Sequence, residues 1–251
     1  MGLRGSRVGG SCLAERLSHY LPLTAREEDA LSTLEQGERT YRRGAVVTRE
    51  HGKGRDLFIV RKGWLYSCLL LGNGSRQIMR LHFPGDLIGL SALAFGRSAD
   101  STVAVTDVVL CSFEKDRLGQ LFVDHPRIGA LLLNLTVAER AALADRLASV
   151  GRTSARARVG SLICEIFARM RVMEGAGTDR FSIPLTQEDI GDATGLTAVH
   201  VNRMMRALVD DGLIERSGNS VRLLREERLA EEAGFVDRFA RIDTSWLPPP
   251  R

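Results

Sequence analysis

The chain has few cysteines, and they are far apart. Its 251 residues include four of them, Cys12, Cys68, Cys111 and Cys164, with no CxxC pair and no tight cluster. This spacing supports neither a zinc finger nor a cysteine-held iron–sulfur cluster, so we expect no metal. Cys68, Cys111 and Cys164 fall in apolar stretches that are typical of buried thiols. A redox-sensing thiol is the alternative.

Long hydrophobic runs are also missing. The longest apolar run, Cys68 to Leu71, is far too short to span a bilayer, so we expect no membrane helix. The first residues, 1–11, hold Gly and Arg but no apolar segment of a signal peptide, so we do not expect secretion. We interpret residues 1–22 as a disordered lead-in.

The sequence also lacks a large excess of positive or negative charge, and it lacks the motifs of common enzymes. The net charge is only +4, and residues 151–225 carry nearly as many Asp and Glu as Arg. A nucleic-acid surface would therefore depend on where the arginines lie rather than on bulk charge. The five histidines are scattered, and no HExxH, GxSxG or Walker sequence is present. We expect no catalytic residues.

From Thr40 to Phe113, short stretches of β-favouring residues alternate with glycines. One turn, Gly72-Asn73-Gly74, directly follows an apolar stretch and is typical of a β-hairpin, because Gly and Asn accept positive φ angles. Many short strands at this spacing predict a small sandwich or barrel of the jelly-roll type. Before them, Thr24 and the acids that follow predict a capped helix start. We expect one β-rich sensory domain over 23–124.

A long helix is predicted over 125–151, with Pro126 in its first turn. Along this helix, apolar and small residues recur at alternating spacings of four and three, which is the pattern of a coiled-coil seam between two copies of the chain. The candidate dimer contacts are Leu133, Val137, Arg140, Ala144 and Leu147. The alternative is that this face packs only against its own barrel.

Residues 152–225 have the pattern of a winged helix-turn-helix domain. Thr186 can cap a short helix, Gly195 can supply a tight turn, and Thr197 can cap a second helix. Two strands joined by a turn over 213–223 would form the wing. In such a domain the second helix enters the major groove of DNA.

The second helix, expected over 198–210, has one apolar face and one polar face. On the polar face, Arg203 can bind O6 and N7 of guanine, which is the commonest specific base contact, and Asn202 can read adenine similarly. Hydroxyl groups and backbone amides at the two helix starts can bind phosphates. The predicted DNA contacts are Thr186, Gln187, Thr197, Ala198, Val199, His200, Asn202, Arg203, Arg206 and Arg222. Residues 226–251 are expected to be a C-terminal extension.

Three sequence segments together resemble the Crp–Fnr family of bacterial transcription regulators. The segment FPGDLIG at 83–89 is similar to the family's strand-and-turn motif in a cyclic-nucleotide-binding-type barrel, and LTQEDIG at 185–191 and LTAVHVNR at 196–203 are similar to its DNA-binding half. The resemblance implies an α+β protein with an N-terminal β jelly-roll sensory domain, a long dimerisation helix and a C-terminal winged helix-turn-helix. It also implies a homodimer on a two-fold site in double-stranded DNA, RNA polymerase as a partner, and the cytoplasm of a bacterium.

The sensory half departs from the cyclic-AMP-responsive members of that family. Leu90 follows the Ile88-Gly89 pair where those members have Glu, and residues 99–102 lack the Arg that they use for the phosphate. Arg97 lies about two positions too early. A cyclic nucleotide needs an arginine or an amide nest for its phosphate. We therefore expect that the candidate effector pocket, Ile88, Gly89, Leu90 and Arg97, does not take cyclic AMP, and we expect no cofactor.

Two further departures affect sensing and DNA readout. Cys12 stands alone where the oxygen-sensing members carry an N-terminal cysteine cluster, and Val199 occupies a position where the family often has Glu. Valine cannot accept a hydrogen bond from cytosine, although it can touch a thymine methyl group. The leading hypothesis is a dimeric transcription regulator whose effector, target genes and sign of regulation stay open. The alternatives are a cyclic-nucleotide-dependent regulator and a ligand-binding or scaffold protein that does not bind DNA.

Overall fold

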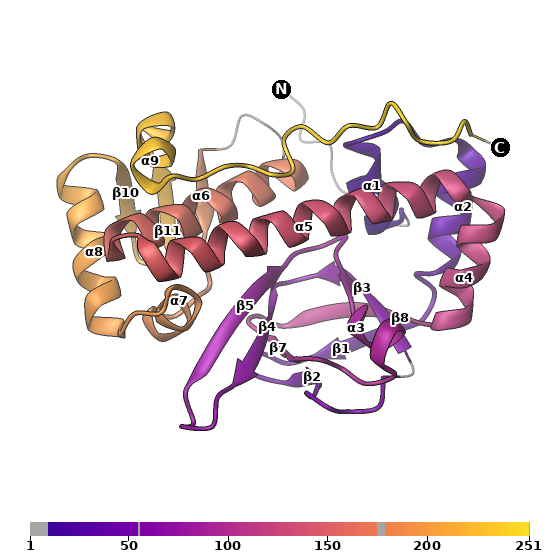
Figure 1. Ribbon diagram of the computed structural model, residues 1–251, viewed down its shortest axis with the longest axis horizontal. Helices are drawn as coiled ribbons and strands as arrows, with labels where there is room; N and C mark the ends of the chain where they lie inside the picture. Colours follow the sequence, from indigo (N-terminus) through magenta and orange to yellow (C-terminus); the bar gives the residue numbers. More distant parts are fainter. Residues whose placement is uncertain (1–9, 55, 175–178, 251) are drawn as a thin grey trace. The chain divides into compact units, whose positions relative to one another are not determined.

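A computed structural model describes the protein over residues 10–54, 56–174 and 179–250. Figure 1 labels the helices and strands along the chain. Contacts within the chain divide it into two compact units. The first unit comprises residues 1–65, 82–135 and 242–251, and the second comprises residues 66–81 and 136–241. This division does not follow the order of the chain, because the segment 66–81 groups with residues 136–241.

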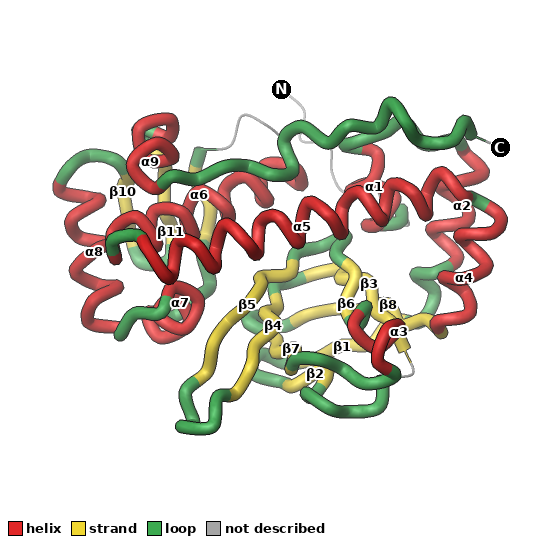
Figure 2. Tube along the Cα trace, in the orientation of Figure 1, coloured by secondary structure: helices red, strands yellow, loops and turns green. Residues whose placement is uncertain are grey.

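Two sheets form the β-rich domain, with the strand orders β1-β8-β3-β6 and β2-β7-β4-β5 (Figure 2). The pairs β1–β8, β3–β8, β3–β6 and β2–β7 are antiparallel. The strands are β1 (Glu38–Tyr41), β2 (Val46–Thr48), β3 (Asp56–Lys62), β4 (Leu65–Leu70), β5 (Arg76–His82), β6 (Leu87–Ile88), β7 (Ser101–Ala104) and β8 (Val108–Glu114). The β-rich N-terminal domain expected from the sequence is confirmed.

The interior of this domain is filled by side chains. Val60 and Leu110 face each other across the β3–β8 register, and both are fully buried. They belong to one apolar cluster, which comprises Phe58, Val60, Leu65, Ile88, Ala104, Val108 and Leu110. Because alternate residues of each strand point inward, this cluster is the core that holds the two sheets together.

The predicted hairpin joins β4 to β5. Gly74 has φ +82°, and its N–H donates to the carbonyl of Leu71 over 2.8 Å. The side-chain oxygen of Asn73 accepts a hydrogen bond of 3.0 Å from the Ser75 N–H. The Gly-Asn-Gly turn therefore closes as its residue types require.

The N-terminal segment corrects one expectation. Residues 12–18, which the sequence pattern assigns to a disordered lead-in, form helix α1 (Cys12–Ser18), capped by Ser11. The carboxylate of Glu35 accepts bonds from Ser11 Oγ at 2.6 Å and from the Leu13 N–H at 3.0 Å, so it helps to satisfy the donors at this helix start. Leu13 and Leu17 are fully buried. The part of the lead-in at 1–9 lies outside the described residues.

Helix α1 also contacts the FPGD turn of the β-rich domain. Arg16 forms an ion pair with Asp86, whose side chain is fully buried, and its guanidinium donates to the carbonyl of Gly85 over 3.3 Å. Gly85 has φ +81°, and a Cβ atom there would lie 2.8 Å from the Cβ of Arg16 and 2.8 Å from the carbonyl oxygen of Cys12. Only glycine permits this approach.

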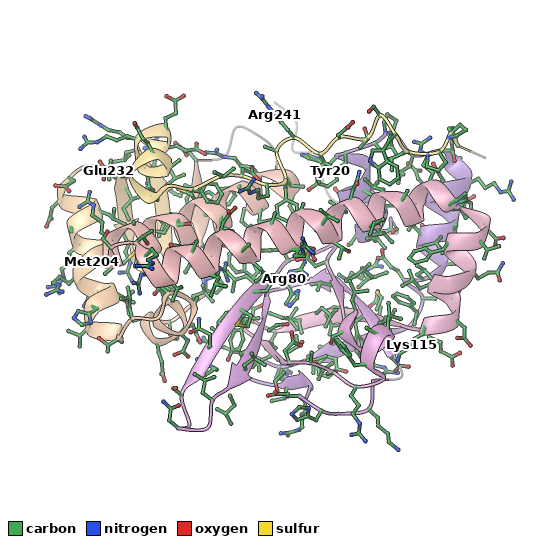
Figure 3. The ribbon with its side chains drawn as sticks, viewed as in Figure 1. Tyr20, Arg80, Lys115, Met204, Glu232 and Arg241 are labelled. Atoms are coloured by element: carbon green, nitrogen blue, oxygen red, sulfur yellow. The ribbon has the colours of Figure 1, made fainter. Side chains whose placement is uncertain are left out.

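Two of the remaining helices of the N-terminal half begin where the sequence predicts. Helix α2 (Ala25–Thr33) begins at the predicted cap, where Thr24 and Glu27 form a capping box. Helices α3 (Ser91–Phe95) and α4 (Lys115–Asp124) follow, and α5 (Pro126–Arg152) begins with Pro126 as expected. On β5, the guanidinium of Arg80, labelled in Figure 3, forms two hydrogen bonds with the Glu139 carboxylate on α5, at 2.5 and 2.7 Å.

The C-terminal half is a small helical domain with a three-stranded sheet. Its elements are α6 (Ala155–Glu174), β9 (Arg180–Ser182), α7 (Gln187–Thr194), α8 (Ala198–Asp210), β10 (Ile214–Ser217), β11 (Ser220–Leu223) and α9 (Glu226–Ala233). The sheet order is β10-β11-β9, so β9 adds a strand to the predicted two-stranded wing. Phe167 of α6 and Phe181 of β9 meet edge to face with centroids 4.8 Å apart, which ties this sheet to the helical core.

The predicted C-terminal extension begins as part of this domain. Leu229 of α9 is 1% exposed and packs over Gly160 of α6, where a Cβ atom would lie 3.1 Å from the Leu229 side chain. Beyond α9, Arg238 binds Asp145 of α5 through two bonds of 2.6 and 2.9 Å. Within the described residues, no helix combines the length and the apolar character that crossing a bilayer requires.

Candidate nucleic-acid interface

Helices α7 and α8 form the helix-turn-helix, and two glycines set its turn. Gly195 ends α7 in the left-handed conformation at φ +68°, as expected from the sequence. At Gly191, a Cβ atom would lie 2.4 Å from the carbonyl oxygen of Leu196. The backbone there is also tied by a 3.0 Å hydrogen bond from the Leu196 N–H to the Gly191 carbonyl. The close approach of the turn to α7 therefore depends on glycine at both positions.

The start of α7 is a capping box. The side chain of Thr186 accepts a bond of 3.0 Å from the Asp189 N–H, and Asp189 Oδ2 accepts bonds from the Thr186 N–H and hydroxyl at 2.9 and 2.7 Å. Thr186 is exposed and Gln187 is half-buried. The first turn of α7 therefore lies near the surface. Because the positive end of the helix dipole is located there, this turn is suited to binding a phosphate.

Helix α8 separates its side chains as predicted, with one exception. Val201, Met205 and Leu208 are buried at 0%, 3% and 0% exposure. Met204, which the apolar pattern predicts to face inward, is half-buried (Figure 3). The exposed residues include Thr197, Ala198, Val199, His200, Asn202, Arg203 and Arg206. The predicted contact residues of this helix and its cap are therefore all on the solvent side.

The exposed residues Val199, His200 and Arg203 differ in whether their side chains already make contacts within the chain. Val199 is 79% exposed, so its side chain contributes almost nothing to the core. The ring nitrogen Nδ1 of His200 lies 3.1 Å from the hydroxyl of Thr197, which also caps α8 by accepting a 3.3 Å bond from the His200 N–H. His200 is therefore engaged at the helix start, whereas Arg203 projects from the middle of the exposed face.

The wing carries two exposed arginines, and one of them, Arg216, lies beside α8. Arg222 donates to Asp179 over 2.8 Å, and this partner lowers the pKa of the Asp179 carboxyl. Arg216 is not among the contacts predicted from the sequence. It lines a surface hollow of about 310 Å³ together with Asn202 and Arg206 of α8. Alternation along β10 does not identify it, because Arg216 lies two positions after the buried Ile214 and the residues after Ile214 are all exposed.

The predicted dimer seam is solvent-exposed in the single chain. On α5, Leu133, Val137 and Leu147 are 57%, 57% and 76% exposed, and Arg140 and Ala144 are exposed beside them. Residues at this spacing share one face of a helix. The seam is thus an uncovered apolar stripe, whereas Leu131 and Leu135 of the same helix are buried.

The candidate effector residues lie on β6 and on either side of α3. Ile88 is 2% exposed and part of the core cluster, Gly89 has φ +89°, and Leu90 caps α3 without a side-chain hydrogen bond. Arg97 donates to the backbone carbonyl of His51 over 2.8 Å. Among these four residues, only Arg97 could bind a phosphate, and its guanidinium already donates to the His51 carbonyl. Leu90 has no carboxylate that could accept a hydrogen bond from a ribose hydroxyl.

The cysteines are buried or half-buried thiols. Burial raises the pKa of Cys164 to about 12 and that of Cys12 to about 11. Burial also raises the pKa of Cys111. A thiol with a raised pKa is a poor nucleophile and a poor metal ligand at neutral pH. In the part of the chain that the structure describes, no three His, Cys, Asp or Glu side chains gather in a way that could hold a metal ion.

A β-rich domain, a long helix and a winged helix-turn-helix define the class of DNA-binding transcription regulators with a sensory domain. Two domain families match the sequence: a cyclic nucleotide-binding domain over residues 38–125 and a Crp-like helix-turn-helix domain over residues 157–232. Together with the relatives below, they show that the chain belongs to the Crp–Fnr family of bacterial transcription regulators, as the sequence motifs indicated.

Relatives and solved structures agree with this assignment. The transcriptional activator protein FnrL of Cereibacter sphaeroides is 31% identical over 216 residues, which is 83% of this chain and 86% of the relative. FnrA of Stutzerimonas stutzeri is 25% identical over 223 residues, covering 89% and 91% of the two chains. The structure of FixK2 from Bradyrhizobium japonicum matches with a TM-score of 0.67 and 26% identity, over 77% of this chain and 95% of that one. These relatives are transcription regulators rather than enzymes.

Proposed function

We propose that this regulator binds a two-fold DNA site as a homodimer, with α8 of each copy in the major groove and α5 as the contact between copies. Arg203 reads a guanine, Asn202 and Val199 contribute to base readout, and the starts of α7 and α8 bind phosphates. Arg206, Arg216 and Arg222 contact the DNA backbone beside them.

One observation carries this proposal: the two faces of α8 are chemically distinct. The buried face holds Val201, Met205 and Leu208 against the core, while Asn202, Arg203 and Arg206 are exposed together. A scaffold role would not require a guanidinium and an amide side by side on the exposed face. Those two groups are the standard readers of guanine and adenine edges.

We further propose that the effector is not a cyclic nucleotide and that no cofactor is required. Leu90 cannot accept a hydrogen bond from a ribose hydroxyl, and Arg97 is held by the His51 carbonyl. RNA polymerase as a partner and action in the cytoplasm are part of the proposal, because the family consists of bacterial transcription regulators.

The test is selection of bound DNA from a random pool, followed by affinity measurements on the selected site and on random DNA. Arg203→Ala removes a bidentate contact worth about 1–3 kcal/mol per half-site. For a symmetric dimer we expect a loss of roughly twice that, about 2–6 kcal/mol, on the selected site only. Arg117→Ala on α4, an exposed arginine outside the interface, is the matched control and should not change affinity.

Two outcomes would contradict the proposal. If Arg203→Ala lowers affinity equally for selected and random DNA, Arg203 is a backbone contact and base reading belongs to Asn202 and Val199. If no sequence is enriched from the pool, with or without cell extract, sequence-specific DNA binding by this chain is wrong.

A further inference from the structure

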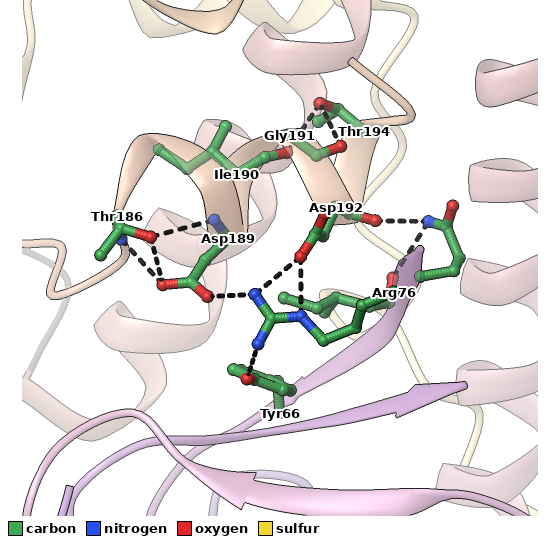
Figure 4. Close-up of polar contacts among 10 residues, drawn as sticks. Tyr66, Arg76, Thr186, Asp189, Ile190, Gly191, Asp192 and Thr194 are labelled. Atoms are coloured by element: carbon green, nitrogen blue, oxygen red, sulfur yellow. Dashed lines mark hydrogen bonds and ion pairs between the residues drawn. The ribbon is translucent and has the colours of Figure 1, made fainter. Parts of the chain in front are cut away.

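Two carboxylates of helix α7 share one arginine from the β4–β5 hairpin. Asp189 and Asp192 lie one helical turn apart, so both face the same side of α7. Arg76 of β5 donates to Asp189 Oδ1 over 2.9 Å from Nη2, and to Asp192 Oδ2 over 2.7 Å from Nε (Figure 4). Nη2 also lies 2.6 Å from Asp192 Oδ2. One guanidinium thus joins both acids.

The hairpin holds this arginine in place. The guanidinium of Arg76 lies over the ring of Tyr66 at 4.9 Å and donates to its hydroxyl. Burial raises the pKa of Tyr66 to about 12, so this hydroxyl stays neutral. The neighbouring Gln77 donates to the backbone carbonyl of Asp192 over 2.7 Å. Two adjacent residues of β5 therefore bind one short helix of the helix-turn-helix.

These contacts are shielded from solvent more than an ordinary surface ion pair. The side chains of Arg76, Asp189 and Asp192 are 30%, 13% and 21% exposed. Partly buried charges are screened less by salt than exposed ones, and hydrogen bonds between ionised partners are stronger than neutral ones. The segment 66–81 belongs, by its contacts, to the same compact unit as α7.

Asp189 connects Arg76 to the predicted phosphate site. Its Oδ1 binds Arg76, while its Oδ2 accepts the two bonds from Thr186 that form the capping box. Thr186 caps the helix whose first turn suits a phosphate. A continuous path of hydrogen bonds therefore runs from the hairpin through Asp189 to the cap of α7 (Figure 4).

The charges at this site oppose DNA unless they are compensated. Asp189 lies in the first turn of α7 and Asp192 in the second. Both carboxylates would repel a DNA phosphate at the start of this helix, and Arg76 supplies one opposite charge at hydrogen-bond distance. We propose that Arg76 is a positioning residue of the DNA interface, which fixes the start of α7 and offsets one of the two negative charges of Asp189 and Asp192 so that a phosphate can approach. This inference rests on the proposed DNA binding.

The experiment is a charge-rescue series on the full-length protein. Affinity for the selected DNA site is measured for wild type, Arg76→Gln, Arg76→Lys and the double variant Arg76→Gln/Asp192→Asn. We expect Arg76→Gln to raise Kd about 10-fold or more, because both half-sites of a dimer lose a compensating charge. Arg76→Lys keeps the charge and should keep most of the affinity. Asp192→Asn, added to Arg76→Gln, should recover at least half of the loss on a logarithmic scale.

The matched control is Arg39→Gln. Arg39 is also an arginine on a strand and forms a 3.0 Å ion pair with Asp56, but both residues belong to the barrel. This variant should leave Kd unchanged. If Arg76→Gln binds DNA as tightly as wild type or more tightly, the proposal is overturned. It is overturned equally if Asp192→Asn restores nothing, since the negative charge that Arg76 offsets would then not be what weakens DNA binding.

A second measurement does not depend on DNA. Hydrogen exchange of the backbone amides at the start of α7 should be faster in Arg76→Gln than in wild type, while the amides of α8 keep their protection. Unchanged exchange at α7 would defeat the positioning role. If wild type selects no DNA sequence but exchange at α7 changes as expected, the proposed function fails and the contact through Arg76 stands.

Discussion

Replacement of Leu147 by Asp is the most direct test of dimerisation through α5. Leu147 is 76% exposed in the single chain, the highest value on the seam, so its side chain has the most apolar surface to lose to a partner. Full burial of a leucine stabilises by about 1.5–3 kcal/mol. Scaled to the exposed fraction, Leu147 contributes about 1–2 kcal/mol per copy and about 2–4 kcal/mol per symmetric dimer.

Loss of this contribution raises the dimer dissociation constant about 30- to 1000-fold. Burial of an unpaired carboxylate in the seam adds a further cost in the same direction. Sedimentation velocity over a dilution series measures the change, and DNA binding of the variant should fall with it because two half-sites are no longer joined.

The control is Leu70→Asp at the end of β4. Leu70 is 69% exposed, close to the value for Leu147, but it is not on α5. This substitution should leave the dimer constant unchanged, which separates loss of the seam from a general effect of adding charge. If Leu147→Asp sediments as a dimer as tight as wild type, α5 is not the contact and the exposed stripe has another role.

Three further predictions concern the sensory domain and the thiols. Calorimetry should detect no micromolar binding of cyclic AMP, because the candidate pocket offers no carboxylate for the ribose and its one guanidinium is held by the His51 carbonyl; heat of binding in that range would prove the interpretation wrong. Cys164 should react with iodoacetamide about a thousandfold more slowly at pH 8 than an ordinary cysteine, since a pKa of about 12 instead of 9.0 depletes the thiolate. Mass spectrometry with a denatured control measures this, and labelling at the denatured rate would contradict it. Gly85→Ala should lower the free energy of unfolding by about 1–3 kcal/mol more than Gly74→Ala in a denaturant titration. Both glycines have positive φ angles, but only a Cβ at Gly85 meets α1, so equal losses would mean that α1 does not pack there in solution.

Local patterns in the sequence are sufficient to predict the main elements. Glycine-punctuated β stretches predict the sheets, and the Gly-Asn-Gly turn predicts the β4–β5 hairpin. The residues Thr24, Thr186 and Thr197 mark three helix starts, all confirmed by side-chain bonds to backbone amides three residues on. Each of these features depends on residues only a few positions apart, so a short sequence segment contains both partners of the interaction.

The two ends of the described chain are harder to predict. Ser11 and the spacing of Leu13 and Leu17 do indicate a short capped helix, but the glycines and arginines before them favour disorder. A seven-residue helix is not stable alone, and α1 depends on the contacts that Glu35 and Asp86 provide. Helix α9 is a similar case, since Leu229 is apolar at the right place but its partner on α6 is far away in the chain.

The contact between Arg76 and Asp189 cannot be predicted from local patterns at all. The two residues are separated by 113 positions, and each has an ordinary local role: one lies in a strand, the other in a capping box. Their meeting depends on the fold of the chain around them, because β5 binds α7 through the side chains of both Arg76 and Gln77. A movement of the β4–β5 hairpin would therefore move the start of α7 directly. The same charge-rescue series tests this coupling, since it changes Arg76 on the hairpin and Asp192 on α7 and leaves every predicted DNA-contacting residue in place.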